Sequence, residues 1–346
     1  MNERPRSRLI ANLRSSDQKW KIYVFIGVVI YFILINQVIH VRPDHAFLAL
    51  VILAFLLGKE KAKRFLTDWS PFIFFWIAYD MMRGVADSIR GTINVVLPYK
   101  VELILFGSLF GGQIPCFWFQ DVQKALDGSV FKALVDLLCA NMYTIHFAAP
   151  LLLGWIFWHT CDDRKMYYRF VYTLTVLNVM ALITFMAYPA APPWYVYKIG
   201  FNQPGPNADY WGISAGSLIN VDRLLGVKFF TTLWDSFNPN HFAAIPSLHG
   251  AYPVVISFFA YKKFKKYPIP LIVYPALTWF AAVYLNQHYI IDLIIGVIYF
   301  AVAYQVEERV LLPGVFNKFL DKVPEQKLVR EVKYTTTVQE EAFKEM

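Results

Sequence analysis

The chain has 346 residues, of which 57% are hydrophobic, 18% aromatic and 17% charged. Soluble domains are only about half apolar and about a quarter charged, so this composition excludes a soluble enzyme, and the aromatic content excludes a disordered or fibrous protein. The net charge of +8 does not indicate nucleic-acid binding, because the basic residues form short clusters between apolar runs, a pattern typical of membrane proteins. We therefore expect a membrane protein that binds no nucleic acid.

The apolar runs predict a polytopic fold. A basic arm at residues 1–21 precedes an apolar run at 22–41, which has the length of about 20 residues that a membrane span needs. Runs at 45–58 and 69–88 predict two spans or one tight hairpin, and the short run at 103–113 is expected at the membrane interface. Further spans are predicted at 140–159, 166–188, 246–261, 270–285 and 288–305. Strand signals are weak, so we expect an all-α bundle of roughly six to eight transmembrane helices.

The basic clusters predict which side of the membrane each connection occupies. Besides the N-terminal arm, Lys and Arg gather at 59–64, 161–169 and 262–267. With eight crossings all of these clusters lie in the cytoplasm, as the positive-inside rule requires. Two long segments, 89–139 and 189–245, then lie on the opposite face, where long ordered loops often carry function.

The same assignment divides the chain into three parts. We expect a cytoplasmic arm at residues 1–21, a single polytopic catalytic domain at 22–305 and a cytoplasmic tail at 306–346.

Three segments at the predicted outer face carry candidate chemistry. In the first, residues 188–195 (YPAAPPWY), the prolines stop a helix. Trp194 and Tyr195 suit the layer of lipid headgroups. The alternative interpretation is a helix stop with an aromatic belt and no further role.

The second segment enters the predicted span at 246–261. Pro246 suits the first turn of a helix, and the free amides of that turn form a phosphate site. Ser247 adds a hydroxyl, and His249 follows about one turn inside. The alternative for His249 is a buried structural histidine that is hydrogen-bonded to a neighbouring helix.

The third segment opens the last predicted span. His288 and Asp292 are four residues apart and share a helix face. An acid in an apolar span needs a partner, and a carboxylate on one ring nitrogen fixes the tautomer and makes the other nitrogen more basic. The alternative is a structural His–Asp hydrogen bond at a helix end.

Together the three segments predict a centre for phosphate chemistry, because two histidines and a carboxylate converge beside a helix N-terminus. A zinc site formed by His249, His288 and Asp292 is the competing interpretation, but it leaves the phosphate-binding helix end without a role. The three cysteines are too widely spaced for a disulfide framework or a CxxC metal site.

These motifs resemble those of the type 2 phosphatidic acid phosphatase superfamily. Pro246-Ser-Leu-His249 and His288-x-x-x-Asp292 are similar to its second and third signature motifs. Leu248 stands where the common second motif has Gly. This variant, with APPWY upstream and the run VDRLLGV at 221–227 between them, resembles the inositol phosphorylceramide synthase branch.

The resemblance implies a two-step transfer that needs no metal or ATP, because one phosphodiester is exchanged for another. His288 would attack the phosphorus of the donor lipid and form a phosphohistidine, and Asp292 would orient His288. His249 would protonate the leaving diacylglycerol oxygen and then deprotonate the attacking ceramide hydroxyl.

The chain departs from the superfamily in its cations. Ala282 occupies the position of an Arg six residues before the histidine of the third motif, and the first motif is not matched. The charge of the transition state must still be neutralised, and the candidates are Arg83, Lys198 and Arg223. Ion pairing with a neighbouring aspartate is the alternative for Arg83 and Arg223.

The sequence thus predicts a transferase that moves phosphoinositol from phosphatidylinositol to ceramide or a related sphingoid lipid. We expect its active site on the non-cytoplasmic face, which is the periplasmic side of a bacterial inner membrane or the Golgi lumen of a eukaryote. One alternative is a membrane lipid phosphate phosphatase, of the phosphatidic acid or polyprenyl diphosphate type, with the same histidines and water as acceptor. The other is a non-enzymatic lipid transporter or scaffold. Headgroup contacts are expected in 89–139 and 196–240.

Overall fold

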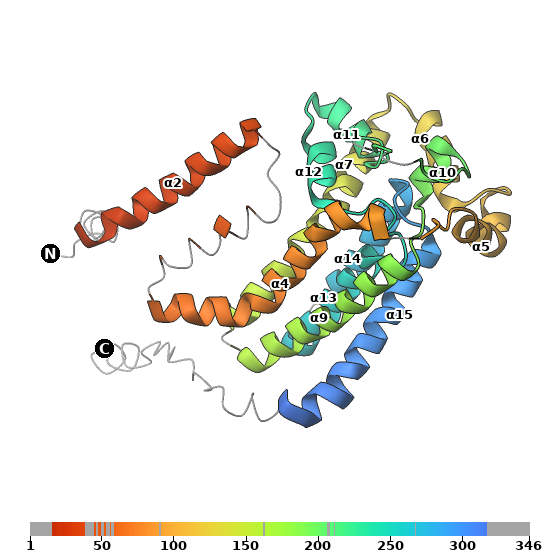
Figure 1. Cartoon of the computed structure of the whole chain (residues 1–346). Helices are drawn as coiled ribbons and strands as arrows, with labels where there is room; N and C mark the ends of the chain where they lie inside the picture. The colour runs from red at the N-terminus through yellow and green to blue at the C-terminus, as the bar shows by residue number, and fades with distance from the viewer. Residues whose placement is uncertain are drawn as a thin grey trace, which may run out of the picture.

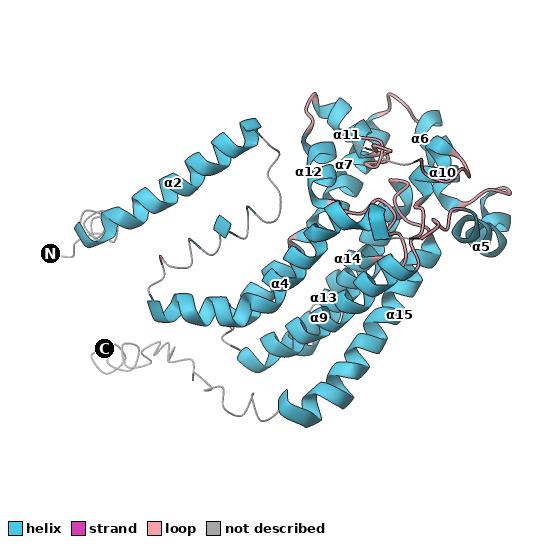
Figure 2. Ribbon diagram, viewed as in Figure 1, coloured by secondary structure: helices cyan, strands magenta, loops and turns pink. Residues whose placement is uncertain are grey.

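The computed structural model describes residues 16–38, 45, 48–49, 52, 56, 59–89, 91–161, 163–205, 208–210, 212–266 and 268–316. Within these ranges the chain is helical and forms no β-strand, which confirms the all-α prediction (Figure 2). Two isolated backbone bridges link Asn94 to Ala190 and Ala190 to Ala243.

The helices are named in chain order (Figure 1). The longer ones are α2 (Ser16–Val38), α4 (Lys59–Ile89), α7 (Val130–Thr144), α9 (Arg164–Ala187), α13 (Leu248–Phe264), α14 (Pro268–Tyr284) and α15 (Ile290–Val306). The shorter ones are α5 (Val96–Phe106), α6 (Pro115–Ala125), α8 (Ala149–Trp155), α10 (Pro193–Ile199), α11 (Leu218–Leu225) and α12 (Phe229–Phe237). Short 3-10 or π turns follow at Gly107–Phe110, Ile145–Phe147, Ile156–Thr160 and Glu307–Phe316.

In the described part of the chain, three helical stretches are long and apolar enough to cross a membrane: Val130–Phe147, Arg164–Ala187 and Ile290–Pro313. The helices Val96–Phe110 and Pro115–Ala125, which meet at a 49° bend, give a fourth if they count as one span. This number is smaller than the sequence predicted, because α13 and α14 have only 17 residues each and the ends of α4 carry charges. The expectation for residues 45–58 falls largely outside the described residues.

Two sequence expectations about local structure are wrong. Residues 140–159 do not form one helix: α7 ends at Thr144, a 3-10 turn follows, and α8 starts at Ala149 with Pro150 in its first turn. Proline lacks the N–H that a continuous helix would use there. Most of 89–139 is helical rather than a loop, whereas 189–245 is irregular chain interrupted by the short helices α10, α11 and α12. Their short helices gather at the end of the bundle where α13 and α15 begin (Figure 1).

The core of the bundle lies between α4, α9, α13 and α15. Buried aromatic side chains from all four helices form one cluster, including Trp69, Phe72, Phe170, Phe259 and Phe300. Burial of such side chains stabilises a helix bundle through close packing.

The first turns of α13 and α15 touch each other through glycines. A Cβ added to Gly296 would lie 2.1 Å from the backbone oxygen of Ser247, and one added to Gly250 would lie 2.5 Å from that of Leu293. The backbone N–H of Ser247 also donates to the carbonyl of Asp292, at 3.1 Å. Small residues at a helix crossing permit such close approach, and here the crossing brings the second and third predicted segments together.

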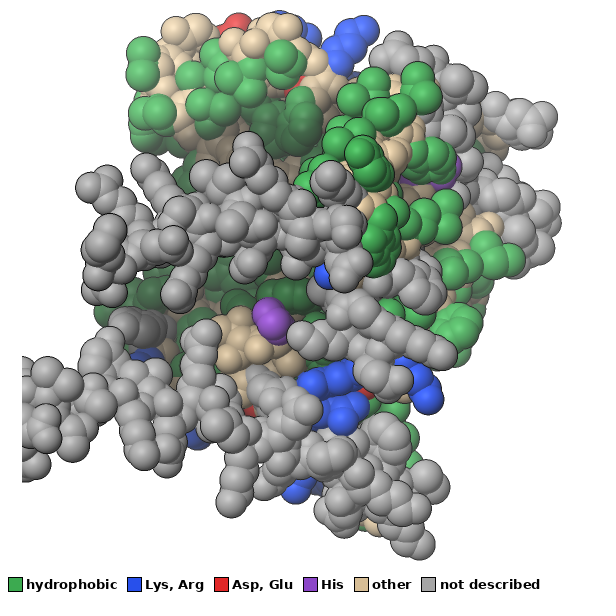
Figure 3. All heavy atoms as spheres, turned by 90° about the vertical axis from the view of Figure 1, so that its left-hand side faces the viewer, with side chains coloured by type: hydrophobic (Ala, Val, Ile, Leu, Met, Phe, Trp, Pro, Cys, Tyr) green, Lys and Arg blue, Asp and Glu red, His purple; other side chains and the backbone are tan. Residues whose placement is uncertain are grey.

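Charged residues hold the opposite end of the bundle. The buried Asp68 of α4 accepts hydrogen bonds from Trp158 Nε1 at 2.7 Å and from Arg164 at 2.9 Å, and Lys263 donates to Asp163 at 2.5 Å. Several Lys and Arg side chains lie in the lower half of the face seen in Figure 3, with hydrophobic side chains above them. This end holds the residues from which the sequence predicts the cytoplasmic side.

Candidate active site

Two helix starts position the three predicted catalytic side chains. Ser247 is the N-cap of α13, and its Oγ accepts a hydrogen bond from the N–H of Gly250 at 3.2 Å. His249 therefore lies in the first turn of α13. His288 precedes α15, and Asp292 in the first turn of α15 accepts the N–H of Tyr289 at 3.0 Å.

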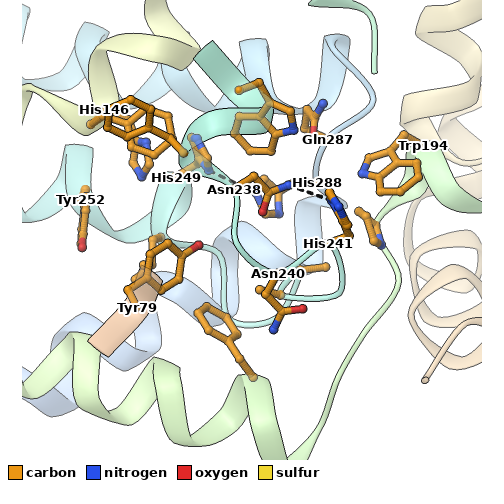
Figure 4. Close-up of a pocket in the computed structure, with 18 of the residues that line it drawn as sticks. Tyr79, His146, Trp194, Asn238, Asn240, His241, His249, Tyr252, Gln287 and His288 are labelled. Atoms are coloured by element: carbon orange, nitrogen blue, oxygen red, sulfur yellow. Dashed lines mark hydrogen bonds between the residues drawn. The ribbon is translucent and has the colours of Figure 1, made fainter. Parts of the chain in front are cut away.

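The three side chains form a chain of contacts, of which Figure 4 shows the two histidines. Nδ1 of His249 lies 3.2 Å from Nε2 of His288, and Nδ1 of His288 lies 3.4 Å from Oδ2 of Asp292. All three are buried, and Asp292 is fully so. In the tautomer of His288 that carries its proton on Nδ1, beside the carboxylate, Nε2 keeps a lone pair that can accept a hydrogen bond from Nδ1–H of His249. The arrangement offers a nucleophilic nitrogen beside a proton donor.

A third histidine, His146, belongs to this centre, although no motif in the sequence indicates it. Its ring stacks on that of His249 with centroids 3.7 Å apart, and Tyr143 stacks on the same ring at 3.9 Å. Tyr143 lies in the last turn of α7 and His146 in the 3-10 turn that follows, and Nδ1 of His146 is buried without a hydrogen-bond partner in the structure. A lone His near a helix end is too common a pattern to indicate this role.

These histidines line a pocket of about 670 Å³, a volume that includes the open solvent at its mouth. Its walls come from α4, α9, α10, α12, α13 and the segments before α13 and α15. Among the described residues that line it, none is Lys, Arg, Asp or Glu. No group of three or more His, Cys, Asp or Glu in the described ranges is arranged to hold a metal ion.

Two members of the first segment, Pro192 and Trp194, line this pocket, and Trp194 is buried there. Tyr195 is buried elsewhere, with its hydroxyl donating to the carbonyl of Asn202 at 2.9 Å, and burial raises the pKa of this phenol. Ser247 does not line the pocket, and its hydroxyl oxygen serves as the helix cap.

The predicted cations do not lie in the pocket as described. Lys198 is exposed, with its ammonium 5.7 Å from the ring of Tyr197. Arg223 is also exposed, and the aspartate beside it, Asp222, accepts the amides at the start of α12. The backbone of α4 at Arg83 is described, but the side chain of Arg83 lies outside the described part of the chain.

Side chains of the helix pair α5–α6 hydrogen-bond to the backbone of the segment around His288, a contact that the sequence did not predict. The fully buried carboxylate of Glu102 accepts the N–H of Ile290 at 2.9 Å and that of Ile291 at 3.2 Å. The thiol of Cys116 donates to the carbonyl of His288 at 3.1 Å. The one signal in the sequence that could have indicated this contact is the lone acid in the apolar run of α5, since such an acid needs a partner.

Known proteins resemble the chain over most of its length. A family model described as the PAP2 superfamily matches residues 118–306. Phosphoinositol dihydroceramide synthase of Bacteroides thetaiotaomicron is 30% identical over 81% of this chain and 89% of its own. Inositol phosphorylceramide synthase catalytic subunit AUR1 of Saccharomyces cerevisiae is 26% identical over 85% of this chain and 69% of its own. Inositol phosphorylceramide synthase of Candida albicans is 27% identical over 70% of this chain and 48% of its own. No solved structure matches the chain.

Proposed function

The chain belongs to the PAP2 superfamily, and on that premise we propose that it transfers phosphoinositol from phosphatidylinositol to ceramide or a related sphingoid lipid, with release of diacylglycerol. The observation that carries the proposal is the buried contact chain from Asp292 through His288 to His249 at the wall of one pocket. The names of the curated relatives supply the substrate class.

The proposed first step uses Nε2 of His288 as the nucleophile. It attacks the phosphorus of the donor, the bond between phosphorus and the diacylglycerol oxygen breaks, and His249 protonates that oxygen. Asp292, 3.4 Å from the other ring nitrogen, stabilises the positive charge that His288 gains on bonding to phosphorus.

The proposed second step reverses the proton flow. His249 takes the proton of the ceramide primary hydroxyl, whose oxygen attacks the phosphohistidine, and the bond between phosphorus and Nε2 breaks. One phosphodiester replaces another, so the cycle is balanced in protons and charge, and His249 returns to its starting state.

The protein is an integral membrane protein, and we place the reaction on its non-cytoplasmic face: the periplasmic side of a bacterial inner membrane, or the Golgi lumen in a eukaryote. The support is the position of the histidines at the end of the bundle remote from Asp68, Asp163 and Lys263. Positive charge flanking membrane spans favours the cytoplasm.

The test is a lipid mass-spectrometric assay of purified protein with phosphatidylinositol and labelled ceramide. We expect inositol phosphorylceramide and an equal amount of diacylglycerol, and neither product from His288→Ala. His159→Ala is the matched control, because His159 is exposed outside the pocket and contacts Trp155; it should keep full activity. Diacylglycerol with free inositol phosphate but no sphingolipid product would instead mean that water is the acceptor, and the transferase proposal would fail.

A further inference from the structure

The pocket at the histidines has two walls of different chemistry. One wall is aromatic and comes from α4, α9, α12 and the turn after α7, with Trp76, Phe147, Phe185 and Phe237 among its members. The other is polar and comes from the segment between α12 and α13, with Asn238, Asn240 and His241, joined by Gln287. Figure 4 shows His241 and Trp194 on the side of His288, and His146 and Tyr252 on the side of His249.

The polar wall is held in place before any ligand binds. The ring of His241 lies within hydrogen-bond distance of Asn238, with Nδ2 and Nδ1 3.4 Å apart, and Asn240 Oδ1 accepts the N–H of Phe242 at 3.1 Å. The carbonyl of Phe242 accepts the N–H of Ala190 at 2.9 Å, which ties this segment to the one before α10. Both asparagines are buried, at 8% and 3% exposure. Fixed polar groups of this kind lose little freedom when a ligand binds.

The groups of this wall discriminate among headgroup types. An amine headgroup calls for a carboxylate, and an additional phosphate calls for Lys or Arg, yet no described residue that lines the pocket is charged in either sense. A quaternary ammonium favours a cage of aromatic faces, not a row of amides. Hydroxyl groups both donate and accept, as do amide and imidazole side chains. The wall is therefore complementary to a neutral ligand that is rich in hydroxyls.

We propose that Asn238, Asn240, His241 and Gln287 form the subsite that binds the hydroxyls of a polyol headgroup on the donor lipid. The inference rests on the proposed function, because it takes the phosphorus to lie at His288 and His249. Gln287 precedes His288 in the chain, and its Nε2 donates to the carbonyl of Ser214 at 2.9 Å, which directs its side chain. A headgroup held here lies beside the nucleophile, on the side opposite to His146 (Figure 4).

The experiment compares a donor that carries a polyol headgroup with one that carries only a methyl group. Short-chain, water-soluble phosphatidylinositol and phosphatidylmethanol share the phosphodiester and the diacylglycerol, and His288→Ala prevents turnover during the binding measurement. We expect the His288→Ala protein to bind phosphatidylinositol more tightly than phosphatidylmethanol. Adding His241→Phe or Asn238→Leu should weaken phosphatidylinositol binding by about three- to tenfold for each lost hydrogen bond, and should change phosphatidylmethanol binding less than about twofold.

The matched control is Asn141→Leu, because Asn141 is exposed and its amide donates to the carbonyl of Leu137 in its own helix; neither donor should be affected. The subsite would be overturned if the His288→Ala protein bound the two donors with equal affinity. It would also be overturned if adding His241→Phe weakened the binding of both donors equally. The phenyl ring keeps the shape of the imidazole, so such a loss could not be ascribed to a missing ring. Selective binding without transfer by the wild-type protein would overturn the proposed function and retain the subsite.

Discussion

His249 is held between two aromatic rings. Tyr143 lies parallel to it with an interplanar angle of 4°, and His146 lies at 27°, with centroid separations of 3.9 and 3.7 Å. Two rings at these separations fit only on opposite faces of the third. Stacking fixes the ring orientation, and so holds in place the imidazole that we propose as the proton donor.

We therefore expect His146→Ala to lower kcat by up to about tenfold, since a stacked pair contributes about 0.5–1.5 kcal/mol, with KM for the donor nearly unchanged. His146→Phe should restore most of kcat, because it keeps the stacked face. Steady-state kinetics on both variants measure the two constants separately. A His146→Phe variant no more active than His146→Ala would show that an imidazole nitrogen, not stacking, is what matters.

The central residues could be selected from the sequence because their signals are local. His288 and Asp292 are four residues apart, and Ser247 and His249 follow a proline just before a helix, so the spacing of each pair together with the order of the motifs indicated that they act together. His146 reaches the same centre from a remote part of the chain, and no periodicity connects it to His249. The sequence shows that Lys198 and Arg223 are positively charged. It does not show in which direction an exposed side chain points.

At the scale of elements, α5 fixes the start of α15. The carboxylate of Glu102 accepts two backbone amides there, at 2.9 and 3.2 Å, one residue beyond the Tyr289 amide that Asp292 accepts. A helix start has free amides and favours negative charge. Glu102 thus acts on the chemistry only by holding the segment that bears His288.

Replacing Glu102 should therefore affect stability and kcat together. A hydrogen bond to a charged group contributes about 1.5–3 kcal/mol, and about 1 kcal/mol corresponds to about 2–4 °C in Tm for a chain of this size class. We expect Glu102→Ala to lower Tm by about 5 °C or more and kcat by at least about tenfold, and Glu102→Gln to retain more of both. Asp121→Asn is the control, because Asp121 is an exposed acid of α6 paired with Lys124. Unchanged kcat in a folded Glu102→Ala protein would contradict the positioning role.

The contact between α13 and α15 gives a second test at this scale. A Cβ at Gly296 would meet the backbone oxygen of Ser247 at 2.1 Å, so the two helix starts must separate. Overpacking costs about 1–3 kcal/mol, and separation also pulls His249 away from His288. We expect Gly296→Ala to lower Tm and abolish transfer. In Gly154→Ala the nearest atom lies at 3.6 Å, an ordinary contact, so both properties should persist. An active Gly296→Ala enzyme would refute this tight coupling of packing to chemistry.

Hydropathy predicted which parts of the chain are apolar helix, but not where each helix breaks. The run at 140–159 is apolar throughout, and Pro150 marks the place where α8 starts as a separate helix. The sequence predicts loops for the polar segments around α10, α11 and α12, because hydropathy does not distinguish a short amphipathic helix from an irregular connection. Their helices are short and depend on tertiary packing, as for Trp234 of α12 against Tyr143.

At the scale of the whole molecule, the bundle has two chemically distinct ends. One end holds the uncharged pocket with its histidines and the short helices around it. The other holds Asp68 with Arg164, and Arg169 with Glu307 at 3.0 Å. A lipid phosphotransferase that takes both substrates from the membrane needs its centre near one surface of the bilayer, and the positive-inside rule assigns the charged end to the cytoplasm.

Thiol labelling in intact cells measures this orientation directly. Asp127 is exposed in the turn between α6 and α7 at the pocket end, and Lys266 is exposed after α13 at the other end. In a Cys161→Ser background, where the remaining cysteines Cys116 and Cys139 are buried, we expect a membrane-impermeant maleimide to label Asp127→Cys in intact cells. It should label Lys266→Cys only after the membrane is opened. Retained transfer activity shows that the labelled proteins are folded. The reverse pattern would place the histidine pocket in the cytoplasm, and donor and acceptor lipids would then have to be drawn from the cytoplasmic leaflet.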